Sequence, residues 1–168
     1  MPKLKPVVAL VPNAAALLEL AERAYADARA APSDPLPTLT CFLLTYHLTD
    51  WTKEAAAFSA SCPFAQTIRE VANGTKHLEL TPKRTPDPHV DTVEAVQGYG
   101  RGRYGVGPYG RAYIAVQTRA SSSEQERPFS AVRILREALD WWATVVPAEE
   151  DKKSRGMDAH GEDAALAD

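Results

Sequence analysis

The spacing of apolar and polar residues along the chain predicts a mainly helical protein. In residues 14–31, apolar side chains recur every three or four positions directly after Asn13, a favourable N-cap residue. We therefore expect a first helix over this range. A second helix, nearly all apolar in its first half, is expected over about residues 38–58. His47 and Asp50 interrupt its apolar pattern, so each needs a polar partner if that helix is buried.

Two further helices are expected on either side of a glycine-rich region. Residues 63–77 begin with a proline, which the first turn of a helix tolerates, and they continue with an apolar face. Residues 128–146 also place apolar side chains at helical spacing, and we expect Pro147 to end that helix. Amphipathic helices with short connections pack well as antiparallel bundles. The predicted fold is therefore mainly α, an antiparallel four-helix bundle.

A β-hairpin is predicted between the third and fourth helices. Residues 92–97 and 112–118 have the composition of β-strands, and residues 98–111 between them contain six of the chain's nine glycines. We expect these segments to form an inserted two-stranded hairpin over about residues 91–118. A lone hairpin is only marginally stable in water, so it should lie against the bundle or pair with another copy.

Composition and charge narrow the class of protein. The chain has 168 residues, of which 45% are apolar and 24% charged, as in an ordinary globular protein. We expect one domain over residues 1–147 and an acidic, flexible tail over residues 148–168. The tail carries seven of the 22 acidic residues, so the rest of the chain is close to neutral and lacks the basic excess of a duplex-binding protein. No apolar run is long enough to span a membrane, and we expect a cytoplasmic protein without a membrane partner.

The candidate chemistry lies on the third predicted helix. Arg69, Asn73 and His77 are successive i, i+4 neighbours, with Lys76 beside them, so one helix face can present all four. An arginine that binds a phosphate and a histidine that moves a proton are sufficient for RNA cleavage without a metal. The same residues are also typical of a solvated helix face or of a polar network that fixes helix register.

His47 and Asp50 of the second helix are expected to support that face. If the second and third helices are antiparallel neighbours, these residues approach Arg69 or Asn73, and an Asp50–Arg69 pair would hold the arginine in place. The sequence contains no HExxH motif and no Cys/His set at zinc spacing. We therefore expect no bound metal and no cofactor.

Two other features bear on chemistry or binding. Cys41 and Cys62 both lie in apolar surroundings, which favours reduced thiols, although a single disulfide is open to them in an oxidising compartment. The glycine-rich tip of the hairpin alternates aromatic and cationic side chains that suit stacking on bases and pairing with phosphates. A contact surface for another protein or subunit explains the same pattern. The tip residues concerned are Tyr99, Arg101, Arg103, Tyr104 and Tyr109.

The segment IREVANGTKH, which contains Arg69, Asn73 and His77, resembles the signature of the HEPN superfamily. Proteins of that family are helical bundles, and many are metal-independent ribonucleases that act as dimers in defence systems. The segments YHLTDW, CPFAQTIREVANGTKHLEL and ILREALDWW are also similar to a group of uncharacterised bacterial and phage proteins. Seven residues separate Arg69 from His77, more than in the usual family signature.

The resemblance implies a HEPN-like protein of a defence or phage-associated locus that binds or cleaves RNA. In that role Arg69 would hold the phosphate, His77 would act as general acid and base, and Asn73 would orient them. The resemblance also implies a homodimer. The alternative is a non-catalytic interaction or scaffold protein that contacts a protein partner of unknown identity through the hairpin tip. The sequence leaves both functions open.

Overall fold

The computed structural model describes residues 11–77, 90–96, 112–118 and 128–161. Within these ranges the chain is mainly helical, as expected, but it has five helices and three strands in place of the predicted four and two. The helices are α1 (Ala14–Ala30), α2 (Pro35–Thr52), α3 (Ala55–Ser61), α4 (Ala65–His77) and α5 (Ala131–Gly161). The strands are β1 (Val90–Val96), β2 (Tyr113–Thr118) and β3 (Pro128–Ser130).

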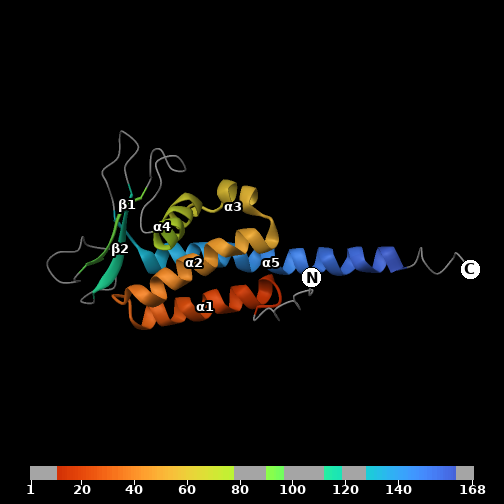
Figure 1. Ribbon diagram of the computed structural model, residues 1–168, viewed down its shortest axis with the longest axis horizontal. Coiled ribbons are helices and arrows are strands. Elements are labelled where there is room, and N and C mark those ends of the chain that lie inside the picture. The colour runs from red at the N-terminus through yellow and green to blue at the C-terminus, as the bar shows by residue number, and fades with distance from the viewer. Residues whose placement is uncertain (1–10, 78–89, 97–111, 119–127, 162–168) are drawn as a thin grey trace, which may run out of the picture.

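Helices α1 and α2 pack side by side (Figure 1). The predicted N-cap of α1 is confirmed, because the Asn13 side chain accepts a hydrogen bond of 2.9 Å from the Ala16 N–H. Helix α2 begins three residues earlier than predicted, since Asp34 caps it and Pro35 occupies its first turn. The Cys41 thiol of α2 donates to the Ala21 carbonyl of α1 at 3.4 Å, so a buried polar contact joins the two helices.

The prediction of one continuous helix over residues 38–58 is wrong. Helix α2 ends at Thr52, and Lys53 adopts the left-handed conformation with φ 65°. The Thr52 hydroxyl donates to the Leu48 carbonyl and accepts from the Glu54 N–H. This local bonding satisfies backbone groups at the break, and α3 then starts in a new direction. Phe58 of α3 is thereby placed over the core.

The predicted limits of the last helix are also wrong at both ends. Residues Pro128–Ser130 pair with β2 as a third strand, so α5 begins only at Ala131. Pro147 lies inside α5, which continues to Gly161 because the residues that follow include strong helix formers such as alanine, glutamate and lysine. Helix α5 runs along α1 and α2 and extends past them (Figure 1).

The three strands form one antiparallel sheet in the order β1-β2-β3. The predicted pairing of β1 with β2 is confirmed, with Val93 opposite Val116 and Val96 opposite Tyr113. Ile114 and Val116 of β2 belong to the same buried cluster as the helices. The sheet therefore lies against the helical part of the molecule, at one end of it (Figure 1).

The core is built mainly from the helices. Its largest fully buried side chains include Phe42 of α2, Phe58 of α3, Ile68 of α4, and Trp142 and Leu135 of α5. In the part of the chain that the structure describes, none of the helices combines the length and apolar character that crossing a membrane requires.

Candidate functional site

Helix α4 carries the predicted constellation. Its backbone places Arg69, Asn73 and His77 at i, i+4 spacing within one continuous helix, which puts them along one face. The Arg69 side chain is exposed and that of Asn73 is half-buried. The side chains of Lys76 and His77 lie outside the described residues, so their convergence with Arg69 stays a prediction.

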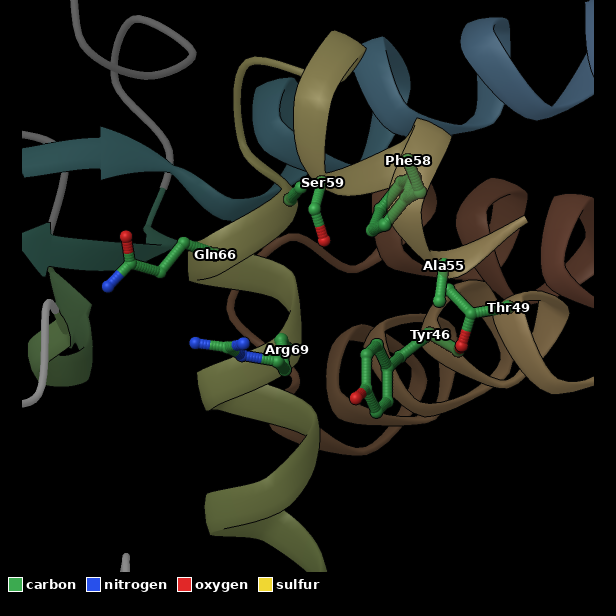
Figure 2. A pocket seen from close by; sticks show the side chains of 8 residues that line it. Tyr46, Thr49, Ala55, Phe58, Ser59, Gln66 and Arg69 are labelled. Carbon is green, nitrogen blue, oxygen red and sulfur yellow. The ribbon is translucent and has the colours of Figure 1, made fainter. Parts of the chain in front are cut away.

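Arg69 stands at the rim of a pocket of about 270 Å³ that three helices enclose. Tyr46 and Thr49 of α2, Phe58 and Ser59 of α3, and Gln66 and Arg69 of α4 line it together with two alanines. Figure 2 shows Arg69 and Tyr46 on opposite sides of this space, with Ser59 above it and with the Arg69 guanidinium extending outward, away from Tyr46. The pocket lies where α2, α3 and α4 contact one another.

An aromatic cluster makes the floor of the pocket rigid. Phe58 is only 1% exposed. Its ring stacks on Trp142 with centroids 5.1 Å apart and meets the edge of Trp141 at 5.3 Å. Aromatic pairs at such distances contribute about 0.5–1.5 kcal/mol beyond the area they bury. These ring contacts hold the Phe58 side chain in a fixed orientation at the floor of the pocket.

Some of the polar groups around the rim already form hydrogen bonds within the protein, and others do not. The Thr49 hydroxyl donates to the Tyr46 carbonyl at 2.7 Å, and the Gln66 amide donates to Glu70 at 3.0 Å, pointing away from the pocket in Figure 2. Among the described residues, no acidic side chain forms an ion pair with Arg69. The rim therefore presents a solvent-exposed guanidinium that can bind an anion.

His47 and Asp50 lie elsewhere than expected. The buried stripe of α2 passes through Thr45 and Leu48, and the two polar residues are on the opposite side of that helix, where no buried partner is needed. His47 Nδ1 lies 3.2 Å from Asp50 Oδ2, and the side chains are 40% and 70% exposed. No ion pair joins Asp50 to Arg69 in the described part of the chain. The structure brings the predicted pair together but does not place it in the pocket.

A buried carboxylate that no sequence pattern predicts lies next to Arg69. Glu70 is 2% exposed. Its Oε2 accepts a hydrogen bond of 2.7 Å from the Val90 N–H, and its Oε1 accepts from Gln66 Nε2. Glu70 thus anchors the first residue of β1 to α4 and fixes the side of the helix that carries Arg69. The sequence signal was an acid that follows Arg69 and directly precedes the apolar Val71.

The remaining candidate residues are placed as follows. Both cysteines are free and buried. Among the described side chains, no group of three or more His, Cys, Asp and Glu residues is arranged to hold a metal ion. The hairpin-tip residues lie outside the described part of the structure, and these are Tyr99, Arg101, Arg103, Tyr104 and Tyr109.

Comparison with known proteins adds no further assignment. No family model matches the chain, and neither a curated protein nor a solved structure matches it.

Proposed function

We propose that this protein binds RNA through the face of α4 that carries Arg69 and Asn73, in a defence or phage-associated setting. The observation that supports the proposal most is the exposed guanidinium of Arg69 at the rim of the pocket, without an acidic partner among the described residues. A guanidinium can bind a phosphate through two parallel hydrogen bonds. The proposal includes the finer fold assignment, a HEPN-like antiparallel bundle that works as a homodimer.

In the enzymatic form of this proposal, the same face cleaves RNA without a metal. Arg69 binds the scissile phosphate and stabilises the negative charge that develops on it. His77, at the end of α4, takes the proton from the 2′-hydroxyl that attacks the phosphorus, or donates one to the departing 5′-oxygen. Asn73 lies one turn from each residue and orients them. His47 and Asp50, exposed on α2, take no direct part.

Binding is tested by fluorescence anisotropy with a labelled single-stranded RNA. Arg69→Ala should weaken binding by about tenfold or more, because the loss of one charge-assisted contact to a phosphate costs roughly 1.5–3 kcal/mol. Arg23→Ala is the matched control, since Arg23 is an exposed arginine on α1 outside the pocket. Equal affinities of the two variants would remove Arg69 from the binding surface.

Cleavage is tested by incubating the protein with total RNA in the presence of a chelator. Wild-type protein should cleave, and His77→Ala should reduce the rate by about 10²-fold or more, the usual contribution of a general acid or base. His47→Ala serves as the control because His47 is a half-exposed histidine on another helix. Equal cleavage by wild type and His77→Ala, or cleavage by neither, would leave RNA binding without the enzymatic step.

The second candidate function is an interaction or scaffold protein that uses its hairpin tip. It is favoured by one observation, that β1 and β2 pair up to Val96 opposite Tyr113, so the two ends of the intervening segment lie side by side. Replacing residues 99–109 by a short turn should then abolish association with a partner or a second copy and leave the melting temperature unchanged. Association that survives this replacement, measured by light scattering, would contradict the proposal.

A further inference from the structure

The lining of the pocket has two chemically distinct parts. Its floor is apolar, formed by the Phe58 ring and by Ala55 and Ala65. Its rim is polar: the Ser59 hydroxyl is directed toward the space, and Arg69 lies at the edge with its guanidinium extending outward. A ligand that matches both parts needs an apolar or planar moiety for the floor and an anionic group for the rim. A nucleotide has this combination, in a base and its neighbouring phosphate.

The size of the pocket limits how much of a nucleic acid can enter. Pockets for drug-sized ligands hold about 300–1,000 Å³, and this pocket, at about 270 Å³, lies just below that range. It therefore suits a single ring system with its sugar and not a run of stacked bases. The half-buried Tyr46 on the wall opposite Arg69 adds an aromatic side chain, and aromatic rings are the usual stacking partners of unpaired bases.

We propose that the pocket between α2, α3 and α4 takes one unpaired base of a single-stranded RNA, while Arg69 binds the phosphate next to that base. This inference rests on the proposed RNA binding and adds a substrate class to it. A base inside a duplex is stacked and paired, so neither its faces nor its polar edge can reach a pocket enclosed by three helices. The protein should accordingly discriminate against duplex RNA.

The position of Arg69 connects the pocket with the rest of α4. The pocket is lined by the first turns of this helix, at Gln66 and Arg69, whereas Asn73 lies one turn further along the same face. A base held in the pocket directs its own phosphate to Arg69 and the next nucleotide along α4 towards Asn73. The pocket thus sets the register of the RNA strand on the helix.

The test fills the pocket without touching Arg69. Ser59→Trp places a large ring at the mouth, where the serine is exposed, and Ser61→Trp adds the same ring to an exposed position of α3 outside the pocket. Ser59→Trp should weaken binding of a short single-stranded RNA by about tenfold, as loss of one base–aromatic stack does. Ser61→Trp should bind as wild type does, and the corresponding duplex RNA should bind wild type about tenfold more weakly.

Two outcomes would overturn the inference, and they differ from each other. If Arg69→Ala weakens binding but Ser59→Trp does not, RNA contacts Arg69 without a base in the pocket. If wild type binds no RNA, or if Arg69→Ala binds as tightly as wild type, the proposed function itself fails and the base site falls with it. Circular dichroism checks that Ser59→Trp is folded. If Ser59→Trp is not folded, Ala55→Phe, which fills the pocket from the α3 side, is used in its place.

Discussion

Two carboxylates on neighbouring helices have opposite environments. Asp50 on α2 has a side chain that is 70% exposed and pairs with His47 three residues earlier. Glu70 on α4 is 2% exposed and binds the Val90 backbone N–H, which lies 20 residues away in sequence. The acid whose contact is only local in sequence is on the surface, and the acid that also binds a distant backbone N–H joins α4 to β1.

The two environments differ because the two contacts join residues at different separations in the sequence. The His47–Asp50 pair needs only one helix turn, so it forms wherever that part of the chain is helical. The Glu70–Val90 contact requires α4 and β1 to meet in one particular arrangement. In this contact a buried carboxylate accepts a hydrogen bond from a backbone N–H. Burying either group without the other would destabilise the folded state. The long-range contact therefore carries more of the stability.

The largest effect is expected from Glu70→Gln. Glutamine keeps the shape of the side chain, but its NH₂ group must face one of the two donors that now bind the carboxylate, the Val90 N–H or Gln66 Nε2. The free energy of unfolding should fall by about 2–3 kcal/mol, as measured by urea denaturation. Glu19→Gln on the exposed side of α1 is the control. Equal stability of the two variants would show that Glu70 is not engaged in solution.

The next effect concerns a buried polar group that can ionise. Burial raises the pKa of Cys41 from 9.0 to about 12, and the hydrogen bond with Thr45 opposes this shift only in part. The folded protein therefore binds the thiol proton more tightly than the unfolded chain does. The associated stability is complete below pH 9 and is lost as the pH rises towards 12. At pH 10, the raised pKa of Cys41 alone should lower the free energy of unfolding by about 1.4 kcal/mol relative to its value below pH 9.

Urea denaturation at pH 8 and pH 10 measures this loss. Cys41→Ala removes the ionisable group but keeps Cys62, whose pKa is also raised by burial. The wild type should lose about 1.4 kcal/mol more than this variant between the two pH values. If the free energy of unfolding falls equally in the two proteins, Cys41 is accessible to water in the folded state and its hydrogen bond to the Ala21 carbonyl is not formed.

The elements that could be predicted from the sequence are those with local determinants. Helix α1 has its cap at Asn13 and a regular apolar stripe, and both signals lie within the helix itself. The pairing of β1 with β2 followed from two strand-like segments around a glycine-rich connection. The break at Lys53 was missed because no glycine or proline marks it. It depends on threonine side chains that bond to the backbone.

The candidate site was predictable to a similar extent. Helical periodicity placed Arg69 and Asn73 on one face of α4, but the pocket beside Arg69 is formed only when α2, α3 and α4 pack together. Its floor depends on Phe58, whose helix was predicted as the end of a longer one. No sequence pattern relates Glu70 to the Val90 N–H, because a backbone donor leaves no signature in residue identity.

A smaller effect is expected from Gln66→Ala. Gln66 donates to the buried Glu70 Oε1 at 3.0 Å, and its removal leaves that oxygen with one donor fewer. The free energy of unfolding should decrease by about 1 kcal/mol. Gln66→Lys restores a donor one turn from the carboxylate and should recover most of this loss. If the alanine and lysine variants are equally stable, Glu70 is satisfied without residue 66.

The smallest effect is expected from Asp50→Asn. The His47–Asp50 pair is exposed on both sides, and exposed ion pairs contribute only about 0–1 kcal/mol. The variant should lose less than about 0.5 kcal/mol in urea denaturation. A double-mutant cycle with Arg69→Ala then asks whether Asp50 also holds the arginine. A coupling free energy near zero is expected because no ion pair joins Asp50 to Arg69. A value above about 1 kcal/mol would show direct contact between them, and Asp50 would then support the arginine that binds the phosphate.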